Sequence, residues 1–359
     1  MKTTGIASLR PADLEAWGRL AARVAEPNPF FEPLFLPAAA AALADGDGDG
    51  VELLVAETGD GEWSGALPVV RRRALGLVAL VEAWQHPYCY LGTPLVDRER
   101  LPEFAAALVS SLAANEHGRF LVLRRCSAGP VLGAIRAAAE AGGLAVLFER
   151  EFERGAYRGR DPGEPLAWIK GKRRSELKRQ RRKLGEELGA EVEVRDRPDL
   201  EAAVADFLAL ESAGWKGEEG TALASDAGSA ELFESMCRAF AAEGRLQLRA
   251  LQAGDRALAM TCDIAADGTL FGFKSAYDES LRRFSPGVQL QTENFGCFDR
   301  ERDEELFDSC AEPDNEMING LWPDRRTIAT VVLGPGGARG ALARRALERA
   351  YSARRRGDD

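Results

Sequence analysis

The residues Arg283-Phe-Ser-Pro-Gly287 stand where a strand-like pattern gives way to a helical one, and their types suit the binding of an anion. The first amide groups of a helix have no partner within the helix and lie at the positive end of its dipole, so they attract phosphate. Gly287 lets a ligand approach the backbone closely, and Arg282 and its neighbour could add charge-assisted hydrogen bonds. The alternative is an ordinary helix start, in which Ser285 is the cap and Pro286 the first helical residue.

A second chemical feature is a basic run at residues 170–183, which holds nine Lys and Arg against one acidic residue. The whole chain has a net charge of −10, so a general nucleic-acid binder is excluded and any anionic partner should meet this local patch. Leu177, Leu184 and Leu188 mark the buried edge of a helix here. Its basic side chains are either a solvated face or a site for an acceptor sugar, a lipid carrier, lipid headgroups or a tRNA arm.

Other chemistries lack their residues. His86 and His117 are too few and too far apart for a histidine metal site, and no G-x-S-x-G motif accompanies them. The six cysteines contain no C-x-x-C pair and are expected to be reduced thiols. We therefore expect no metal. The sequence also contains no apolar run long enough for a membrane span and no signal peptide, so a cytoplasmic protein is expected. It does not indicate an oligomeric state.

The elements that must position these residues come in a repeated order. A helical start at 11–44 is followed by the order βββαβαβ up to residue 152, and a helix at 172–188 opens a similar series that ends in a strand at 327–333. This repetition predicts an α/β protein (an α+β mixed sheet) built by duplication. The predicted domains are 1–160 and 166–335, with a basic tail helix at 336–359.

The second half resembles a known family. The segments KRRSELKRQRRKLGEELG (172–189), Trp215-Lys-Gly217, Ala276-Tyr-Asp278 with Phe284-Ser-Pro-Gly287, and Asp308-Ser-Cys310 with Trp322 look like the acetyltransferase domain of CelD-type proteins. Those proteins belong to the GNAT superfamily and are similar to the Fem aminoacyltransferases. The resemblance covers roughly residues 165–333, and it implies two GNAT-like domains in tandem, as in Fem-like proteins.

The resemblance also implies a site. In a GNAT sheet the fourth and fifth strands, here 269–277 and 305–309, splay apart to admit the pantetheine arm of an acetyl-CoA or acyl-CoA donor, whose pyrophosphate rests on the following loop. The implied donor-binding residues are Arg282, Arg283, Phe284, Ser285, Gly287, Val288 and Gln289. The stretch departs from the family's Q/R-x-x-G-x-G/A signature, since only its basic start and one glycine are kept, so a charged acyl carrier or aminoacyl-tRNA stays open as the donor.

Amine attack on a thioester needs a base, an oxyanion donor and a proton source. The implied catalytic candidates around the splay are Asp308, Tyr277, Lys274 and Cys310, and the substrate-binding candidates are Trp215, Asp263, Asp278, Glu312, Asn315 and Trp322. Each has a structural alternative: Asp308 as a turn cap, Cys310 as a packing thiol and the tryptophans as core residues.

Three functions remain open at this stage. The first is an N-acyltransferase acting on a small amine or amino sugar in polysaccharide or cell-envelope synthesis. The second is a Fem-like aminoacyltransferase that uses charged tRNA, and the third is a non-catalytic GNAT-like module of a polysaccharide-secretion complex.

Overall fold

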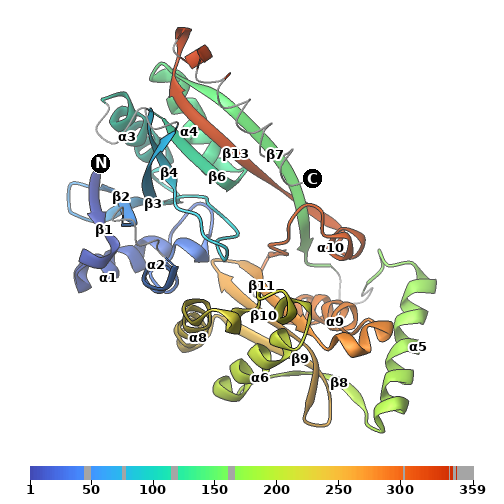
Figure 1. The fold of residues 1–359 in the computed structure, drawn as a ribbon. Helices are drawn as coiled ribbons and strands as arrows, with labels where there is room; N and C mark the ends of the chain where they lie inside the picture. Colours follow the sequence, from blue (N-terminus) through green and yellow to red (C-terminus); the bar gives the residue numbers. More distant parts are fainter. Residues whose placement is uncertain are drawn as a thin grey trace. The chain divides into compact units, whose positions relative to one another are not determined.

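The structure is a computed structural model that describes residues 1–43, 50–74, 78–114, 120–160, 166–301, 304–338, 340–342 and 345. The chain divides into two compact units (Figure 1). Unit 1 comprises residues 1–153 and 327–359, and unit 2 comprises residues 154–326. The chain therefore leaves unit 1, builds unit 2 and returns to unit 1.

Unit 1 is built on a mixed sheet with the strand order β1-β2-β3-β4-β6-β13. Neighbouring strands in this sheet are antiparallel, except for β4 and β6, which are parallel to each other. The short β5 pairs with β3, and β7 leads from unit 1 into unit 2. Its elements are β1 (Lys2–Gly5), α1 (Pro11–Ala21), α2 (Leu36–Leu43), β2 (Glu52–Glu57), β3 (Trp63–Ala74), β4 (Val78–Ala83), β5 (Leu95–Val96), α3 (Leu101–Ala113), β6 (Leu121–Ser127), α4 (Pro130–Ala141), β7 (Leu144–Arg158) and β13 (Asp324–Pro335).

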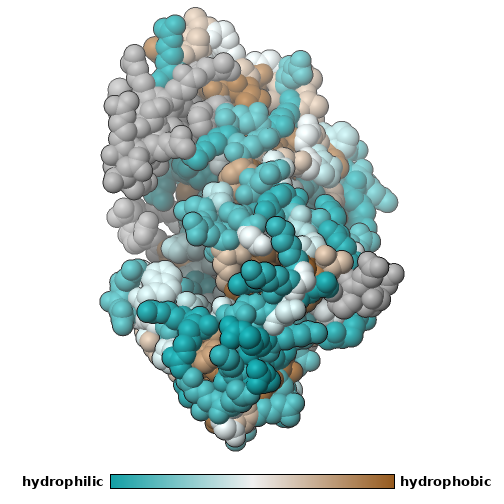
Figure 2. All heavy atoms as spheres, turned by 90° about the vertical axis from the view of Figure 1, so that its right-hand side faces the viewer, coloured by the Kyte–Doolittle hydropathy of each residue, from teal (hydrophilic) through white to brown (hydrophobic). Residues whose placement is uncertain are grey.

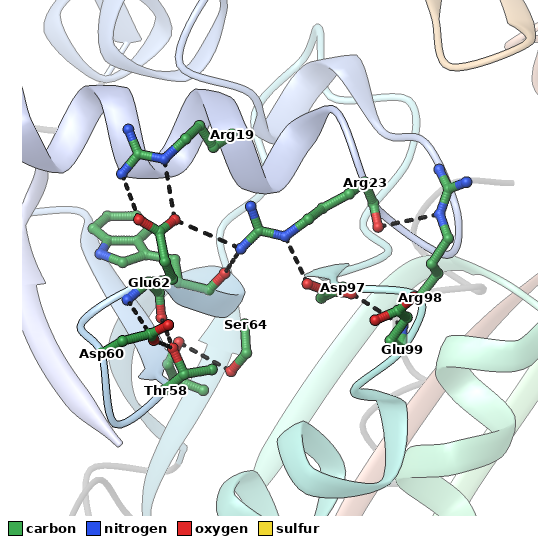
Figure 3. A network of polar contacts seen from close by, with 11 residues as sticks. Arg19, Arg23, Thr58, Asp60, Glu62, Ser64, Asp97, Arg98 and Glu99 are labelled. Atoms are coloured by element: carbon green, nitrogen blue, oxygen red, sulfur yellow. Dashed lines mark hydrogen bonds and ion pairs between the residues drawn. The ribbon is translucent and has the colours of Figure 1, made fainter.

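An ion-pair network ties three parts of unit 1 together (Figure 3). Arg23, just after α1, donates to the Asp97 carboxylate at 2.6 Å and to the Trp63 carbonyl at 2.9 Å. Arg19 forms two hydrogen bonds with Glu62 in the turn between β2 and β3. The network thus fixes α1 against that turn and against the start of the loop before α3, which is a structural role.

Unit 2 is also built on a mixed sheet, in which the end of β7 is followed by β12, β11, β10, β9 and β8. The helices α5 and α9 lie on one face and α6 and α8 on the other (Figure 1). Its elements are α5 (Gly171–Leu188), β8 (Val192–Asp196), α6 (Leu200–Ser212), α7 (Trp215–Glu218), α8 (Ala227–Ala242), β9 (Leu246–Ala253), β10 (Arg256–Ala266), β11 (Thr269–Tyr277), α9 (Pro286–Glu301), β12 (Leu306–Asp308) and α10 (Glu316–Leu321).

Local sequence signals explain these helix boundaries. Asp199 and Asp226 cap α6 and α8 by accepting from the amides of Ala202 and Ser229. Gly189, with φ of +63°, ends α5 in the left-handed conformation that glycine adopts without strain.

Apolar side chains bury both faces of the unit 2 sheet. Leu184 of α5, Leu251 and Leu258 of the sheet and Leu290 of α9 belong to one cluster. On the opposite face Phe233 of α8 stacks on Phe273 at 6.2 Å between ring centroids. Because both faces are covered, a polar side chain inside this sheet needs a partner or a function.

The division between the units differs from the predicted domains. The sequence placed the boundary at 160–166 and kept residues up to 335 in the second domain. In the structure the division falls between Glu153 and Arg154, and residues from Thr327 on belong to unit 1 because β13 pairs with β6. The strand predicted to end at Phe152 continues to Arg158, and the tail helix predicted at 336–359 falls largely outside the described residues.

Candidate active site

The unit 2 sheet opens between β11 and β12. These parallel strands pair only at Thr269, Leu270 and Phe271, whereas β11 continues to Tyr277. Beyond Phe271, β10 is the strand that pairs with β11 within the described residues. The ladder between β11 and β12 therefore ends at Phe271, and an extended ligand could approach β11 beyond that point as an added strand.

A β-bulge at this opening decides where Lys274 lies. Asp263 of β10 pairs with Gly272, but the preceding Cys262 pairs with Lys274, so Phe273 is an extra residue in β11. Phe273 packs against α8, and Cys262 contacts Cys237 of α8, so Lys274 shares their face. Burial, together with the nearby charge of Lys216, lowers the Lys274 pKa to about 8, against the opposing effect of Glu211.

Asp263 lies on the other face of the sheet, beneath α9. Its neighbour Thr261 accepts from Asn294 of α9 at 3.0 Å, and Asp263 is 3% exposed with no hydrogen-bond partner for Oδ2 among the described residues. Burial raises the Asp263 pKa to about 7, although Arg249 and the Thr261 hydrogen bond oppose the shift. Because its strand partner is Gly272, no side chain stands between the carboxyl group and the opening.

The carboxylate of Asp308 is held by three donors, one of which is the amide expected if Asp308 caps the following turn. Its carboxylate accepts from Arg154 at 2.6 Å, from Arg326 at 2.7 Å and from the Cys310 amide at 3.0 Å. Burial alone would raise the pKa of Asp308, but the two guanidinium groups hold it below its ordinary value. A buried carboxylate held in this way is a poor proton acceptor, so the geometry favours a structural anchor over a base.

Cys310 is equally unsuited to attack a carbonyl. Its side chain is buried. Burial first, and then the charge of Asp308, raises the pKa of the thiol above its ordinary value. A thiol kept protonated is a weak nucleophile.

The C-terminal end of β11 brings together residues that are distant in sequence. Trp215 and Tyr277, both more than a third exposed, line a small pocket of about 30 Å³ with Glu211, Lys216 and Glu279. The Lys216 ammonium contacts the Glu211 carboxylate at 2.7 Å, and Glu279 accepts from the Trp215 amide. Trp215 and Tyr277, predicted separately, therefore share one site, which Glu211 and Lys216 extend towards Lys274.

The loop before α9 forms a tight helix start. A 3-10 turn at Glu279–Phe284 is followed by Ser285 in the left-handed conformation (φ of +53°), and α9 begins at Pro286. The Gln289 amide already donates to the Ser285 carbonyl. Since proline has no amide hydrogen, Gly287 and Val288 supply the amides that remain for a ligand at this end.

The two arginines of this loop, Arg282 and Arg283, differ in their contacts. Arg283 is paired with Glu187 of α5 at 2.5 Å and lies over the Phe284 ring, whereas Arg282 is exposed. Phe284 is buried, and its carbonyl accepts from the Gln289 side chain. Gly287 has room for a β-carbon, whose nearest neighbour would be the Tyr277 ring at 3.7 Å. The packing of the protein around this position therefore does not require a glycine.

The other predicted substrate-binding residues have structural contacts. Asp278 caps the 3-10 turn and pairs with Arg256 at 2.6 Å, and Asn315 caps α10. Trp322 is 3% exposed within the aromatic cluster beneath α9, and Glu312 is exposed.

Sequence reasoning missed Glu211, Lys216, Thr261 and Asn294. The available signal for Asn294 was the number of polar residues in the 286–301 helix, several of which are buried with it. In the part of the chain that the structure describes, no group of three or more His, Cys, Asp or Glu side chains could hold a metal ion. None of the described helices combines the length and apolarity required to cross a membrane.

The comparisons with known proteins agree with this geometry. Residues 171–296 match the family model of the acetyltransferase (GNAT) domain. No curated protein sequence matches the chain.

Solved structures show the same fold at low sequence identity. The crystal structure of FemX aligns with a TM-score of 0.60 at 12% identity, covering 92% of this chain and 97% of that one. The C-terminal domain of a putative lysylphosphatidylglycerol synthetase from Agrobacterium fabrum aligns with a TM-score of 0.52 at 13% identity, covering 92% and 94%. The predicted tandem, Fem-like fold is confirmed, and residues 171–296 are similar to the acetyltransferase (GNAT) domain.

Proposed function

We propose that unit 2 transfers an acyl group from a thioester donor to an amine. The observation that carries this proposal is the opening in the sheet, where the pairing of β11 with β12 stops at Phe271 while β11 runs on to Tyr277. An acyl-CoA donor would place its pantetheine arm beside β11 beyond Phe271, where β12 no longer pairs with it, and its pyrophosphate on the Gly287 and Val288 amides.

The residues at this opening supply groups for the chemistry. Asp263, with an unpartnered oxygen and a pKa near 7, accepts the proton that the amine loses as its nitrogen attacks the carbonyl carbon. The Lys274 ammonium lies on the opposite face and stabilises the negative charge that develops on the carbonyl oxygen. The C–S bond then breaks, and Tyr277 at the end of the strand is placed to protonate the thiolate.

The acceptor that we propose is a small amine or an amino sugar. Trp215 and Tyr277 are exposed next to the charged group of Glu211 and Lys216, and sugars stack on such rings. A role in polysaccharide or cell-envelope synthesis, in the cytoplasm, is part of this proposal.

A donor of the aminoacyl-tRNA type is the second candidate. Two observations favour it: the exposed cations of α5 beside α9, and a fold shared with FemX and with the lysylphosphatidylglycerol synthetase domain. The attacking amine and the residues at the opening would be the same, but the leaving group would be an ester oxygen.

Calorimetric titration with acetyl-CoA tests the first candidate. We expect the native protein to bind it and Gly287→Trp to lose at least tenfold in affinity, because the indole would fill the space at the α9 amides. Gly320→Trp is the matched control, since Gly320 on α10 is exposed and also has open space around it.

Absence of acetyl-CoA binding at millimolar concentration would contradict the first candidate. Transfer of a labelled aminoacyl group from charged tRNA to an amine, with no transfer from acetyl-CoA, would instead support the second.

A further inference from the structure

The positive charge of α5 is distributed unevenly along the helix. Towards its C-terminal half three cations are paired, Arg179 with Glu176, Arg181 with Glu293 and Arg182 with Glu186, and Lys183 is the one cation there without an ion pair among the described residues. Towards its N-terminus, Lys172, Arg173, Arg174 and Lys178 are exposed and have no ion-pair partner among the described residues. The face that contains α5 is mostly hydrophilic in its lower part (Figure 2). The uncompensated charge is therefore concentrated at one end of the helix.

This arrangement opposes the stability of the helix itself. No acidic residue lies in the first turn of α5, and no side chain caps it at Lys170. Cations at the positive end of the helix dipole destabilise the helix. A helix end that breaks both rules is expected where an anion binds, since the anion satisfies the free amides and the side chains together.

A groove lined by residues of α5 and α9 lies beside these cations. Its volume of about 770 Å³ is in the range of small-molecule sites, roughly 300–1,000 Å³. The charged groups in its lining are Arg174, Lys178 and Arg181 against Glu293, and Leu166 and Leu177 supply an apolar part.

A buried amide in the groove points independently to a ligand. Gln289 lines the groove and is 3% exposed. Its Nε2 atom donates to the Phe284 carbonyl at 2.7 Å, but its Oε1 atom has no hydrogen-bond partner among the described residues. An unpartnered acceptor of this kind requires a hydroxyl or N–H donor, which a simple inorganic anion lacks.

We propose that the groove binds a nucleoside diphosphate group. Its phosphates contact Arg174, Lys178 and the first amides of α5, a ribose hydroxyl donates to Gln289 Oε1, and the base packs on Leu166 and Leu177. Two sources share this chemistry. One is the nucleotide end of an acyl-CoA donor, in which case this inference rests on the proposed function and moves the donor's pyrophosphate from the Gly287 and Val288 amides into the groove. The other is a separate nucleotide-linked substrate.

Calorimetric titrations with ADP, inorganic pyrophosphate and acetyl-CoA test the proposal on the full chain. We expect the double variant Arg174→Glu, Lys178→Glu to weaken ADP binding at least tenfold. The control Arg182→Glu, Lys183→Glu makes the same charge change on the same helix outside the groove and should change ADP affinity less than threefold. Gln289→Leu should weaken ADP binding severalfold and leave pyrophosphate binding unchanged, which also shows that this variant is folded.

The two sources give different results with acetyl-CoA. If the groove holds the donor's nucleotide, the double variant Arg174→Glu, Lys178→Glu binds acetyl-CoA more weakly than the native protein does. Its affinity for acetyl-pantetheine, which lacks the nucleotide, is unchanged. If it holds a separate ligand, acetyl-CoA affinity does not change.

Three outcomes would overturn the proposal. They are no ADP binding by the native protein at 10 mM and low salt, an equal loss in both double variants, and strong binding of an RNA oligonucleotide or anionic vesicles without ADP binding. These results concern nucleotide binding alone, whereas the Gly287→Trp titration tests the sheet opening, so failure of one proposal is distinguishable from failure of the other.

Discussion

At the scale of single residues, Asp263 is the group whose titration should be visible in stability. Its pKa is about 7 in the folded protein, against an ordinary value of 3.8. Between these values the folded state holds a proton that the unfolded state has released, so the free energy of unfolding falls as pH rises from 5 to 7.5, by at most about 2.5 kcal/mol. Asp263→Asn should remove this fall in urea unfolding curves, whereas Asp255→Asn, at an exposed turn, should keep it. An unchanged slope in Asp263→Asn would contradict the assignment.

A second prediction at this scale concerns Asp308. Asp308→Asn leaves the buried Arg154 guanidinium without its counter-charge, and we expect a loss of about 3–5 kcal/mol in unfolding free energy. The exposed Asp314→Asn should change it by less than 0.5 kcal/mol. If Asp308→Asn were fully stable but inactive in acyl transfer, the predicted role as a base would be restored.

At the scale of elements, the bulge in β11 holds Lys274 on the buried face beside α8, at a cost to stability. Its pKa is lowered to about 8 by burial and by Lys216, so Lys274→Met should raise the unfolding free energy at pH 7 by about 1–3 kcal/mol. The same variant should slow acyl transfer at least a hundredfold if the ammonium stabilises the oxyanion, and Lys274→Arg should recover part of the rate. Greater stability with unchanged turnover would show that Lys274 does not take part in the reaction.

The elements were also the part of the fold that the sequence specified best. The helix at 172–188 and the strand at 269–277 were predicted nearly to the residue, and Gly189 marks the end of the helix. The bulge was not predictable, since an extra residue in one strand is visible only once β10 is paired with it. The contact of Asp308 with Arg154 was not predictable either, because the two residues are 154 positions apart in the sequence and meet only in the folded chain.

The course of the whole chain leads to the last prediction. β13 closes the sheet of unit 1 through its pairing with β6, and Ile328, Val331, Val332 and Leu333 are each at most 1% exposed. Burial of such side chains contributes about 1.5–3 kcal/mol each, which together is comparable to the 5–15 kcal/mol of a whole domain. A chain that ends at Arg326 should therefore contain a folded unit 2 and an unfolded unit 1.

Hydrogen–deuterium exchange should show this directly. In the chain that ends at Arg326, β2, β3 and β6 should lose protection while β9, β10 and β11 keep it, whereas a chain that ends at Ala338 should protect both sets. Protection of β6 without β13 would mean that unit 1 is complete by residue 153. Loss of protection in β10 would mean that unit 2 depends on unit 1 to fold. The expected result requires that unit 1, although it begins at the N-terminus, cannot finish folding until the strand that follows unit 2 has been made.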